Sequence, residues 1–107
     1  MRHPENDCIA IAKSKDGEHF LFKCPGCNES HVIYPDTMKG AGARWKIHSI
    51  NPLTISPSLL VRWEWGENYD KRRCHSFIKN NQIQFLSDCT HELAGKTVPL
   101  EVWDESD

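Results

Sequence analysis

Two groups of potential metal ligands, about 50 positions apart, constrain this chain more than any other feature. Cys24 and Cys27 flank a Pro-Gly pair, and the second half of the chain holds Cys74-His75 and Cys89-Thr90-His91. Two thiolates separated by two residues on a turn can both point at one ion, and tetrahedral zinc then needs two more ligands from elsewhere. The sequence therefore predicts one zinc site that joins the two halves of the chain.

A metal ion suits a chain of this size and composition. With 107 residues, of which 38% are apolar, we expect a single domain over residues 1–107 with a modest core. Five cysteines cannot all pair with one another, and no apolar stretch is long enough to span a membrane. We therefore expect thiolates rather than disulfides, a cytoplasmic location and no membrane partner. The net charge of −2 does not favour nucleic-acid binding.

The first half of the chain has the pattern of short antiparallel strands. Residues 8–13 and 18–23 are strand-like and flank Asp16-Gly17, a dipeptide typical of hairpin turns. The second of these strands runs directly into Cys24, so the Cys-x-x-Cys pair is expected to form a knuckle on a tight turn. Residues 35–43 have no periodicity and are rich in small residues near their end, which predicts a surface loop.

The second half continues this pattern. Residues 87–95 have room for one helical turn, and 104–107 form an acidic tail that we expect to be frayed. The predicted fold is thus mostly β, a small zinc-stabilised antiparallel domain built from hairpins with at most one short helical turn. The further strands are expected within residues 45–50, 53–58, 59–65, 74–78, 82–86 and 96–103.

The register of the last hairpin bears on the ligand set. If Asn80-Asn81 is a two-residue turn, Ile78 lies opposite Ile83, Ser76 opposite Phe85 and Cys74 opposite Ser87. Cys89 then falls on the same face as Cys74. This register favours a site made of four cysteines, and it leaves Cys8 over as a half-buried thiol. The predicted zinc ligands are Cys24, Cys27, Cys74 and Cys89.

An alternative ligand set stays open at this point. A bulge near Ser87 would shift the face that each later residue occupies. His75 or His91 would then replace Cys74 or Cys89 as a zinc ligand. In either set four protein ligands close the site, so the zinc is expected to be structural.

The opposite face of the same hairpin holds a possible catalytic group. Adjacent strand residues alternate sides, so His75 points away from Cys74 and comes within reach of Asp88. An acid that orients an imidazole forms two thirds of a nucleophilic triad, and Ser56 or Ser58 in the Ser-Pro-Ser turn would complete it. We prefer Ser58, with His75 as the base and Asp88 as the orienting acid. The plain alternative is an ordinary turn beside a hydrogen-bonded His-Asp pair.

These motifs resemble two related groups of proteins. Over residues 20–100 the chain resembles small phage and prophage proteins of unknown role, which often carry automatic names such as ammonia monooxygenase. Over residues 24–86 it resembles, more distantly, a small domain of bacterial ubiquitin-like conjugation (Bub) operons. The motifs that carry both resemblances are Cys24-Pro-Gly-Cys27, Trp45, Pro52-Leu-Thr-Ile-Ser-Pro-Ser58 and Cys74-His-Ser-Phe-Ile78.

Two different functions are consistent with these motifs. In the Bub group the motif that corresponds to Cys74-His-Ser-Phe-Ile78 reads roughly Ser-His-Phe-x-Ile. His75 therefore matches, and Cys74 stands in place of a serine. That group implies a zinc-stabilised serine peptidase acting on a peptide or on a ubiquitin-like tail. The alternative function is that of a non-catalytic, phage-encoded zinc module in the host cytoplasm that binds a host protein to counter a defence system. Both functions require a protein or peptide partner.

Overall fold

The computed structural model describes residues 1–104, which form strands, turns and loops and contain no helix. The predicted acidic tail lies, from residue 105 onward, outside the described residues. No segment of the described chain is a helix long and apolar enough to cross a membrane. The strands are β1 (Arg2–His3), β2 (Asn6–Ser14), β3 (Gly17–Cys24), β4 (Glu29–Ile33), β5 (Lys46–Ile50), β6 (Leu53–Ser56), β7 (Leu59–Trp65), β8 (Asp70–Lys79), β9 (Gln82–Phe85) and β10 (Thr97–Pro99).

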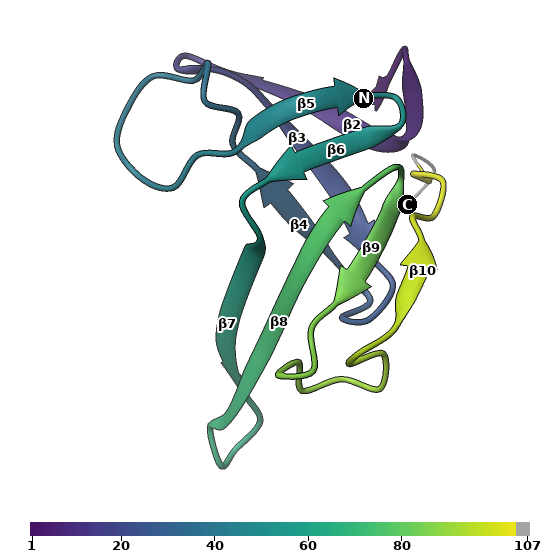
Figure 1. Cartoon of the computed structure of the whole chain (residues 1–107). Helices are drawn as coiled ribbons and strands as arrows, with labels where there is room; N and C mark the ends of the chain where they lie inside the picture. The colour runs from purple at the N-terminus through teal and green to yellow at the C-terminus, as the bar shows by residue number, and fades with distance from the viewer. Residues whose placement is uncertain (105–107) are drawn as a thin grey trace.

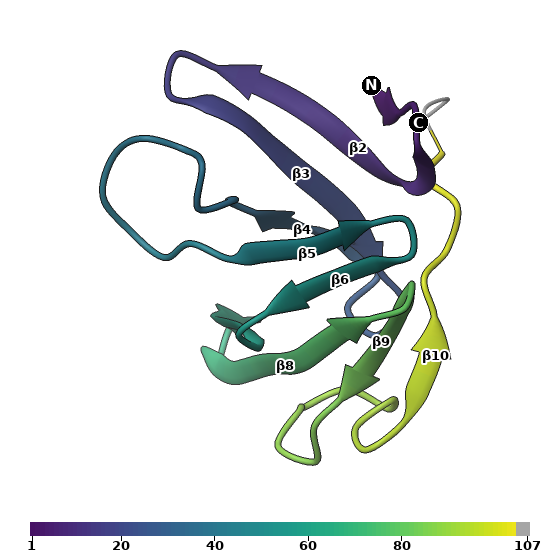
Figure 2. The same ribbon diagram turned by 45° about the horizontal axis from the view of Figure 1, so that its top comes forward.

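The strands make three antiparallel sheets (Figures 1 and 2). One has the order β1-β2-β3-β4, the second has the order β10-β9-β8-β7, and β5 pairs only with β6. The first sheet comes from the first third of the chain and the second sheet from its last half. The predicted mostly β, antiparallel fold is confirmed.

One face of the first sheet, which contains the predicted N-terminal hairpin, is buried in the core. Its register places Ile9 opposite Phe22, and Phe20 opposite Ile33 on the next strand. All four of these side chains are at most 7% exposed. Because β3 ends at Cys24 and β4 begins at Glu29, the Cys-x-x-Cys pair lies on the turn between two paired strands, as the sequence predicts.

The last hairpin has the predicted register up to the end of β9. Asn80 and Asn81 adopt positive φ angles of 54° and 61°, which asparagine tolerates in a two-residue hairpin turn. Ile78 then pairs with Ile83, and Ser76 pairs with Phe85. The predicted pairing of Cys74 with Ser87 does not form, because the chain leaves the strand after Phe85 and turns, with the Cys89 amide donating to the Leu86 carbonyl at 3.2 Å.

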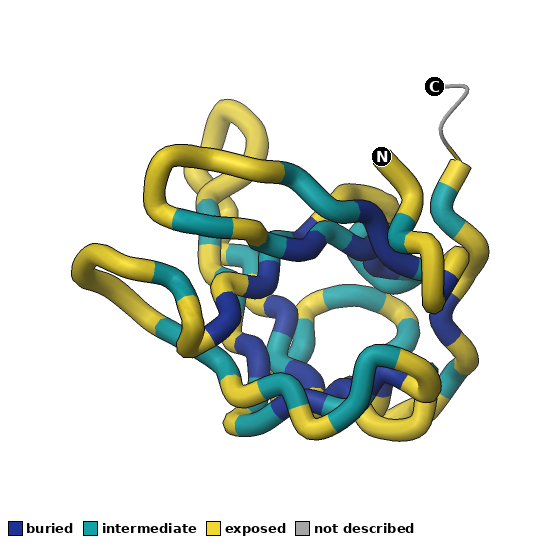
Figure 3. The backbone as a smooth tube through the Cα atoms, turned by 90° about the horizontal axis from the view of Figure 1, so that it is seen from above, coloured by how far each residue is buried: buried dark blue, intermediate teal, exposed yellow. Residues whose placement is uncertain are grey.

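The core lies between the sheets (Figure 3). Viewed from above, the buried positions cluster on the inward-facing parts of the backbone, while the long connecting loops are exposed. Residues 87–95, where the sequence left room for a helical turn, form a series of turns without a helix. The loop at residues 35–43 lies at the surface apart from Pro35. The buried hydrophobic cluster consists of Ile9, Phe20, Phe22, Cys24, Ile33, Leu53, Ile55, Leu59, Cys74, Ile78, Ile83, Phe85 and Leu100.

Candidate active site and metal cluster

A serine, a histidine and an aspartate are joined by hydrogen bonds on one face of the second sheet. Ser58 Oγ lies 3.0 Å from His75 Nε2, and His75 Nδ1 lies 3.2 Å from Asp88 Oδ2. The imidazole thus uses both of its nitrogens, one toward a hydroxyl and one toward a carboxylate. This order of groups is the one that serine hydrolases use to activate a nucleophile.

Each member of this group comes from a different kind of element. Ser58 directly precedes β7, His75 lies within β8 opposite Leu60, and Asp88 lies on the turn that follows β9. The Ser58 carbonyl accepts a hydrogen bond from Trp45 Nε1 at 3.2 Å, which ties the serine backbone to the segment before β5. The His75 side chain is 24% exposed, so the imidazole is partly accessible to solvent.

Arg73 contacts the same carboxylate oxygen and was not singled out from the sequence. Its Nη1 lies 3.6 Å from Asp88 Oδ2, on the strand that also carries His75. Both partners are more than 40% exposed, so this ion pair adds little to the stability of the fold. It restrains the carboxylate beside the imidazole. The signal that could have found Arg73 is strand alternation, because residues 73 and 75 share a face.

Ser56, the alternative nucleophile, has a histidine neighbour of its own. Its Oγ lies 2.7 Å from His48 Nε2 in an exposed position. Within residues 1–104 no carboxylate forms an ion pair with His48, so this pair has no orienting acid. The geometry therefore favours Ser58 over Ser56 as a nucleophile.

Four potential ligands converge on the opposite side of β8. The ligand atoms of Cys24, Cys27, Cys74 and His91 all lie within 4.8 Å of one another, and the Sγ atoms of Cys24 and Cys74 are 3.8 Å apart. Cys24 and Cys74 are fully buried, and the other two are half-buried. Three sulfurs and one imidazole nitrogen at such distances could hold a metal ion in tetrahedral geometry.

The surroundings of His91 fit a metal ligand. Its Nε2 is buried and has no hydrogen-bond partner among the described residues, a costly state that a metal ion would relieve. The imidazole also packs directly over Gly26, where a Cβ atom would lie only 2.3 Å from Cε1. A glycine inside the Cys-x-x-Cys turn is what lets the histidine approach the cysteines. This requirement could not be read from the cysteine spacing alone.

The three thiols of the cluster differ in their pKa values. Hydrogen bonds from Cys27 and Cys74 hold the pKa of Cys24 far below its ordinary value. The contact with Cys24 raises the pKa of Cys27 to about 12, the contacts with Cys24 and Cys27 raise the pKa of Cys74, and burial adds to both effects. One thiol of the group is thus stabilised as a thiolate, and its negative charge disfavours ionisation of the other two. A divalent cation bound among them would neutralise this charge.

Cys89 lies outside this cluster, which differs from the predicted ligand set. Its Sγ is 3.2 Å from both the amide nitrogen and the carbonyl oxygen of His75, at the edge of β8 that β9 has left. Because the chain turns after Leu86 instead of continuing as a strand, residue 91 rather than residue 89 reaches the other cysteines. The structure thus brings together Cys24, Cys27, Cys74 and His91, which is one form of the alternative that the sequence left open.

The remaining cysteine, Cys8, is not part of the Cys24, Cys27, Cys74 and His91 cluster. It is half-buried, and its Sγ lies 3.8 Å from the Leu100 carbonyl oxygen. Burial raises the pKa of this thiol, and the nearby charge of Asp7 adds to the effect.

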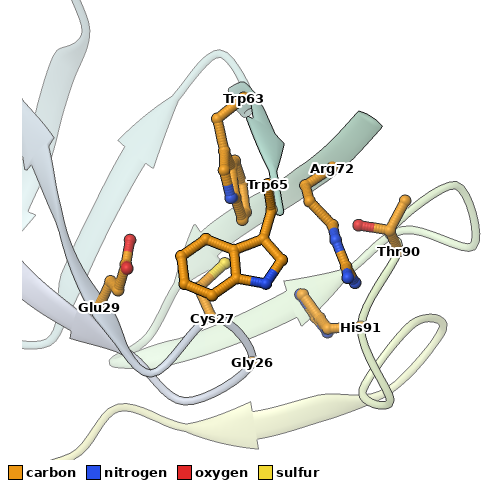
Figure 4. A pocket seen from close by; sticks show the side chains of 8 residues that line it. All are labelled: Gly26, Cys27, Glu29, Trp63, Trp65, Arg72, Thr90 and His91. Atoms are coloured by element: carbon orange, nitrogen blue, oxygen red, sulfur yellow. The ribbon is translucent and has the colours of Figure 1, made fainter. Parts of the chain in front are cut away.

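An open pocket of about 260 Å³ lies beside the metal cluster. Figure 4 shows the indole of Trp65 near Cys27, with Trp63 behind it and the imidazole of His91 to one side. Trp65 is 61% exposed, so the tryptophans at the end of β7 cover the cluster only partly. The pocket is lined by Gly26, Cys27, Glu29, Trp63, Trp65, Arg72, Thr90 and His91.

Comparison with known proteins identifies the family. The model of a family described as bacterial ubiquitination-like system serine protease (BubE) matches residues 1–86. No curated protein and no solved structure matches the chain. The match supports the resemblance to the Bub operon domain. It contains Ser58, His75 and the three clustered cysteines, and it ends just before Asp88 and His91. Since it covers most of the sequence, the chain belongs to the BubE family of serine proteases of bacterial ubiquitination-like systems.

Proposed function

We propose that this protein is a serine peptidase in which Ser58 is the nucleophile, His75 the general base and Asp88 the residue that orients His75. The observation that carries the proposal is the continuous line of hydrogen bonds from Ser58 Oγ through both nitrogens of His75 to Asp88. The family to which the chain belongs is described as a serine protease, which supports the same assignment.

The proposed reaction has two stages. His75 Nε2 takes the Ser58 hydroxyl proton as Oγ attacks the substrate carbonyl carbon, and the same nitrogen then gives this proton to the leaving amine as the peptide bond breaks. In the second stage His75 takes a proton from water, whose oxygen attacks the ester carbon, and His75 then returns this proton to Ser58 Oγ as the ester bond breaks and the acid is released. Asp88 accepts a hydrogen bond from Nδ1 and stabilises the imidazolium that forms in both stages.

We propose that the substrate is a peptide or the tail of a ubiquitin-like protein in the cytoplasm. The family description places the protease in a ubiquitination-like system, whose modifier is a protein. The partly exposed position of His75 on the sheet face suits a flexible chain segment better than an enclosed small molecule.

We further propose that Cys24, Cys27, Cys74 and His91 hold a zinc ion. A donor set of three sulfurs and one nitrogen is typical of structural zinc. When bound, the ion joins the turn after β3, strand β8 and the segment after β9, and four protein ligands leave it no open position for substrate. His75 and Ser58 carry out the chemistry on the other face of β8.

The test of the peptidase is cleavage of a ubiquitin-like protein that carries a C-terminal extension, taken from a bacterial ubiquitination-like system. Mass spectrometry of the products should show cleavage by the wild-type protein and by Ser56→Ala, and none by Ser58→Ala. Ser56→Ala is the matched control because Ser56 lies two residues away and also contacts a histidine. Cleavage that survives in Ser58→Ala, or that is lost only in Ser56→Ala, would contradict the assignment. A folded wild-type protein that cleaves nothing but captures the intact modifier would favour the non-catalytic binding module.

A further inference from the structure

Strand β7 has a free edge that begins at the proposed nucleophile. It is the outermost strand of the sheet β10-β9-β8-β7, and Figure 1 shows β8 on one side of it and no paired strand on the other. Ser58 directly precedes this strand. An unpaired strand edge is a template onto which an extended peptide can add by backbone hydrogen bonds.

The hydrogen bonds of β8 show which backbone groups of β7 are free. The His75 amide donates to Cys89 Sγ, and the His75 carbonyl accepts from the Leu86 amide. The Arg73 amide donates to Thr90 Oγ1, and its carbonyl accepts from the Thr90 amide. All of these partners lie on the side of β8 away from β7. In an antiparallel pair, residues opposite such positions also turn their amide and carbonyl groups away from the partner strand. Leu60 lies opposite His75 and Arg62 lies opposite Arg73. The backbone groups of Leu60 and Arg62 therefore point outward to the free edge, and those of Glu64 follow by alternation.

These outward groups are not used elsewhere in the described chain. Within residues 1–104 no other segment forms a backbone hydrogen bond with Leu60, Arg62 or Glu64. Their neighbours Leu59, Val61 and Trp63 face β8 instead and make the ladder with it. The edge thus presents evenly spaced donors and acceptors that lead directly to Ser58.

The side chains along this edge lie on the catalytic face. Leu60 is the cross-strand partner of His75, and Phe77 lies two residues beyond His75 on β8, so strand alternation places both on the face that His75 occupies. Leu60 is 44% exposed and Phe77 is 43% exposed. Two exposed apolar side chains beside the hydroxyl of the proposed nucleophile would pack against an apolar side chain of a bound peptide.

Farther from Ser58 the same face carries three basic side chains together with Glu64, which lies opposite Lys71. Arg62 and Arg73 lie directly opposite each other, and Lys71 follows on β8. Arg73 has Asp88 at 3.6 Å, whereas Arg62 forms no ion pair with any carboxylate of residues 1–104. An open pocket of about 590 Å³ includes Arg62, Lys71, Arg73 and Asp88 in its lining. A peptide carboxylate at this point would give Arg62 the partner that the chain does not provide.

We propose that an extended substrate segment binds as an added antiparallel strand along the free edge of β7. The segment lies upstream of the cleaved bond, with an apolar residue beside Leu60 and Phe77 and an acidic residue two positions farther upstream beside Arg62. Two positions separate them because residues on one face of a strand are two apart. The direction relative to the cleaved bond rests on Ser58 being the nucleophile, but the binding itself does not.

Binding is tested without catalysis, using the ¹⁵N-labelled Ser58→Ala protein. The probes are the acetylated peptide Asp-Thr-Leu-Thr-Ala-Ser and its counterpart with Lys in place of Asp. The amide signals of Leu60, Arg62 and Glu64 should shift with the acidic peptide, and those of Leu59, Val61 and Trp63 should shift less, because their amides already bond to β8. Shifts confined to another surface, no saturable shift at millimolar peptide, or dimerisation of the protein through this edge would overturn the proposal.

The preference for an acidic residue beside Arg62 is tested with the variant Arg62→Glu. The acidic peptide should bind about tenfold more tightly than the lysine peptide, and Arg62→Glu should reverse this order. Lys15→Glu is the control, since it makes the same charge change at an exposed lysine in the turn between β2 and β3. An unchanged preference in Arg62→Glu would contradict the role of Arg62. If Ser58→Ala cleaves as well as wild type while these shifts occur, the proposed catalytic role fails and the docking edge stands.

Discussion

Cys74 and His75 are adjacent on β8 and point to opposite faces of the sheet, Cys74 toward Cys24, Cys27 and His91, and His75 toward Ser58 and Asp88. The segment after β9 also contributes one residue to each group, because Asp88 contacts His75 and His91 lies with the cysteines. The cluster and the candidate active site thus share two short segments. A metal ion bound on one face would fix the positions of the base and the acid on the other face.

Replacing each of the two adjacent residues should separate stability from catalysis. Cys74→Ala removes a buried ligand, so we expect loss of bound zinc and a fall in Tm of more than about 10 °C. His75→Ala removes only a partly exposed side chain, so the protein should keep one zinc and its Tm while losing cleavage. Native mass spectrometry and thermal unfolding measure both. Loss of zinc in His75→Ala would contradict the division of roles between the two faces.

The fourth ligand is decided by comparing Cys89→Ala with His91→Ala. His91 lies in the cluster and Cys89 does not, so His91→Ala should lose the metal and Cys89→Ala should retain it. Zinc content after extensive dialysis checks this directly. The opposite pattern would restore the ligand set of four cysteines that strand register favoured.

Gly26→Ala should weaken the metal site by displacing a ligand. An added Cβ would come within 2.3 Å of the His91 imidazole, which must then move away from the cysteines. We expect a loss of zinc affinity of tenfold or more and a lower Tm. The control is the same substitution in a His91→Ala background, where the clash no longer exists. An equal loss of Tm in both backgrounds would show that the effect does not pass through His91.

Asp88→Asn should lower the rate of cleavage while leaving the fold intact. The amide cannot hold the imidazole in the correct tautomer or stabilise its cation, and in serine proteases this change costs about 10⁴ in kcat. Since the side chain is 41% exposed, Tm should change by little. Arg73→Ala removes the other partner of this carboxylate and should cost much less. A rate in Asp88→Asn close to wild type would remove Asp88 from the mechanism.

Part of this structure could be predicted from the sequence, because its turns determine the register of the strands. The turns at Lys15-Asp16 and Asn80-Asn81 determine the register of two hairpins, and alternation along β8 then separates Cys74 from His75. The same alternation placed Asp88 within reach of His75, and the Ser-Pro-Ser turn that leads into the neighbouring strand offered Ser58, or Ser56, as the third member. The hydrogen bonds do join them, while their catalytic roles stay predictions.

The position of His91 could not be predicted in this way. It depends on where β9 ends, and no local pattern near Leu86 marks that point. The turn forms because the thiol of Cys89 and the hydroxyl of Thr90 satisfy the free backbone groups of β8. Such contacts between distant parts of a chain are not visible in strand periodicity. The role of Gly26 also depends on a contact of this kind.

The nucleophile can be identified directly by mapping a covalent adduct on the intact protein. A fluorophosphonate reacts with a serine hydroxyl only when a neighbouring base activates it, so its target reports the nucleophile. We predict one adduct, located on Ser58 by tandem mass spectrometry in the wild-type protein and absent from His75→Ala. An adduct on Ser56, an adduct that persists in His75→Ala, or no adduct on the folded wild-type protein would contradict this prediction.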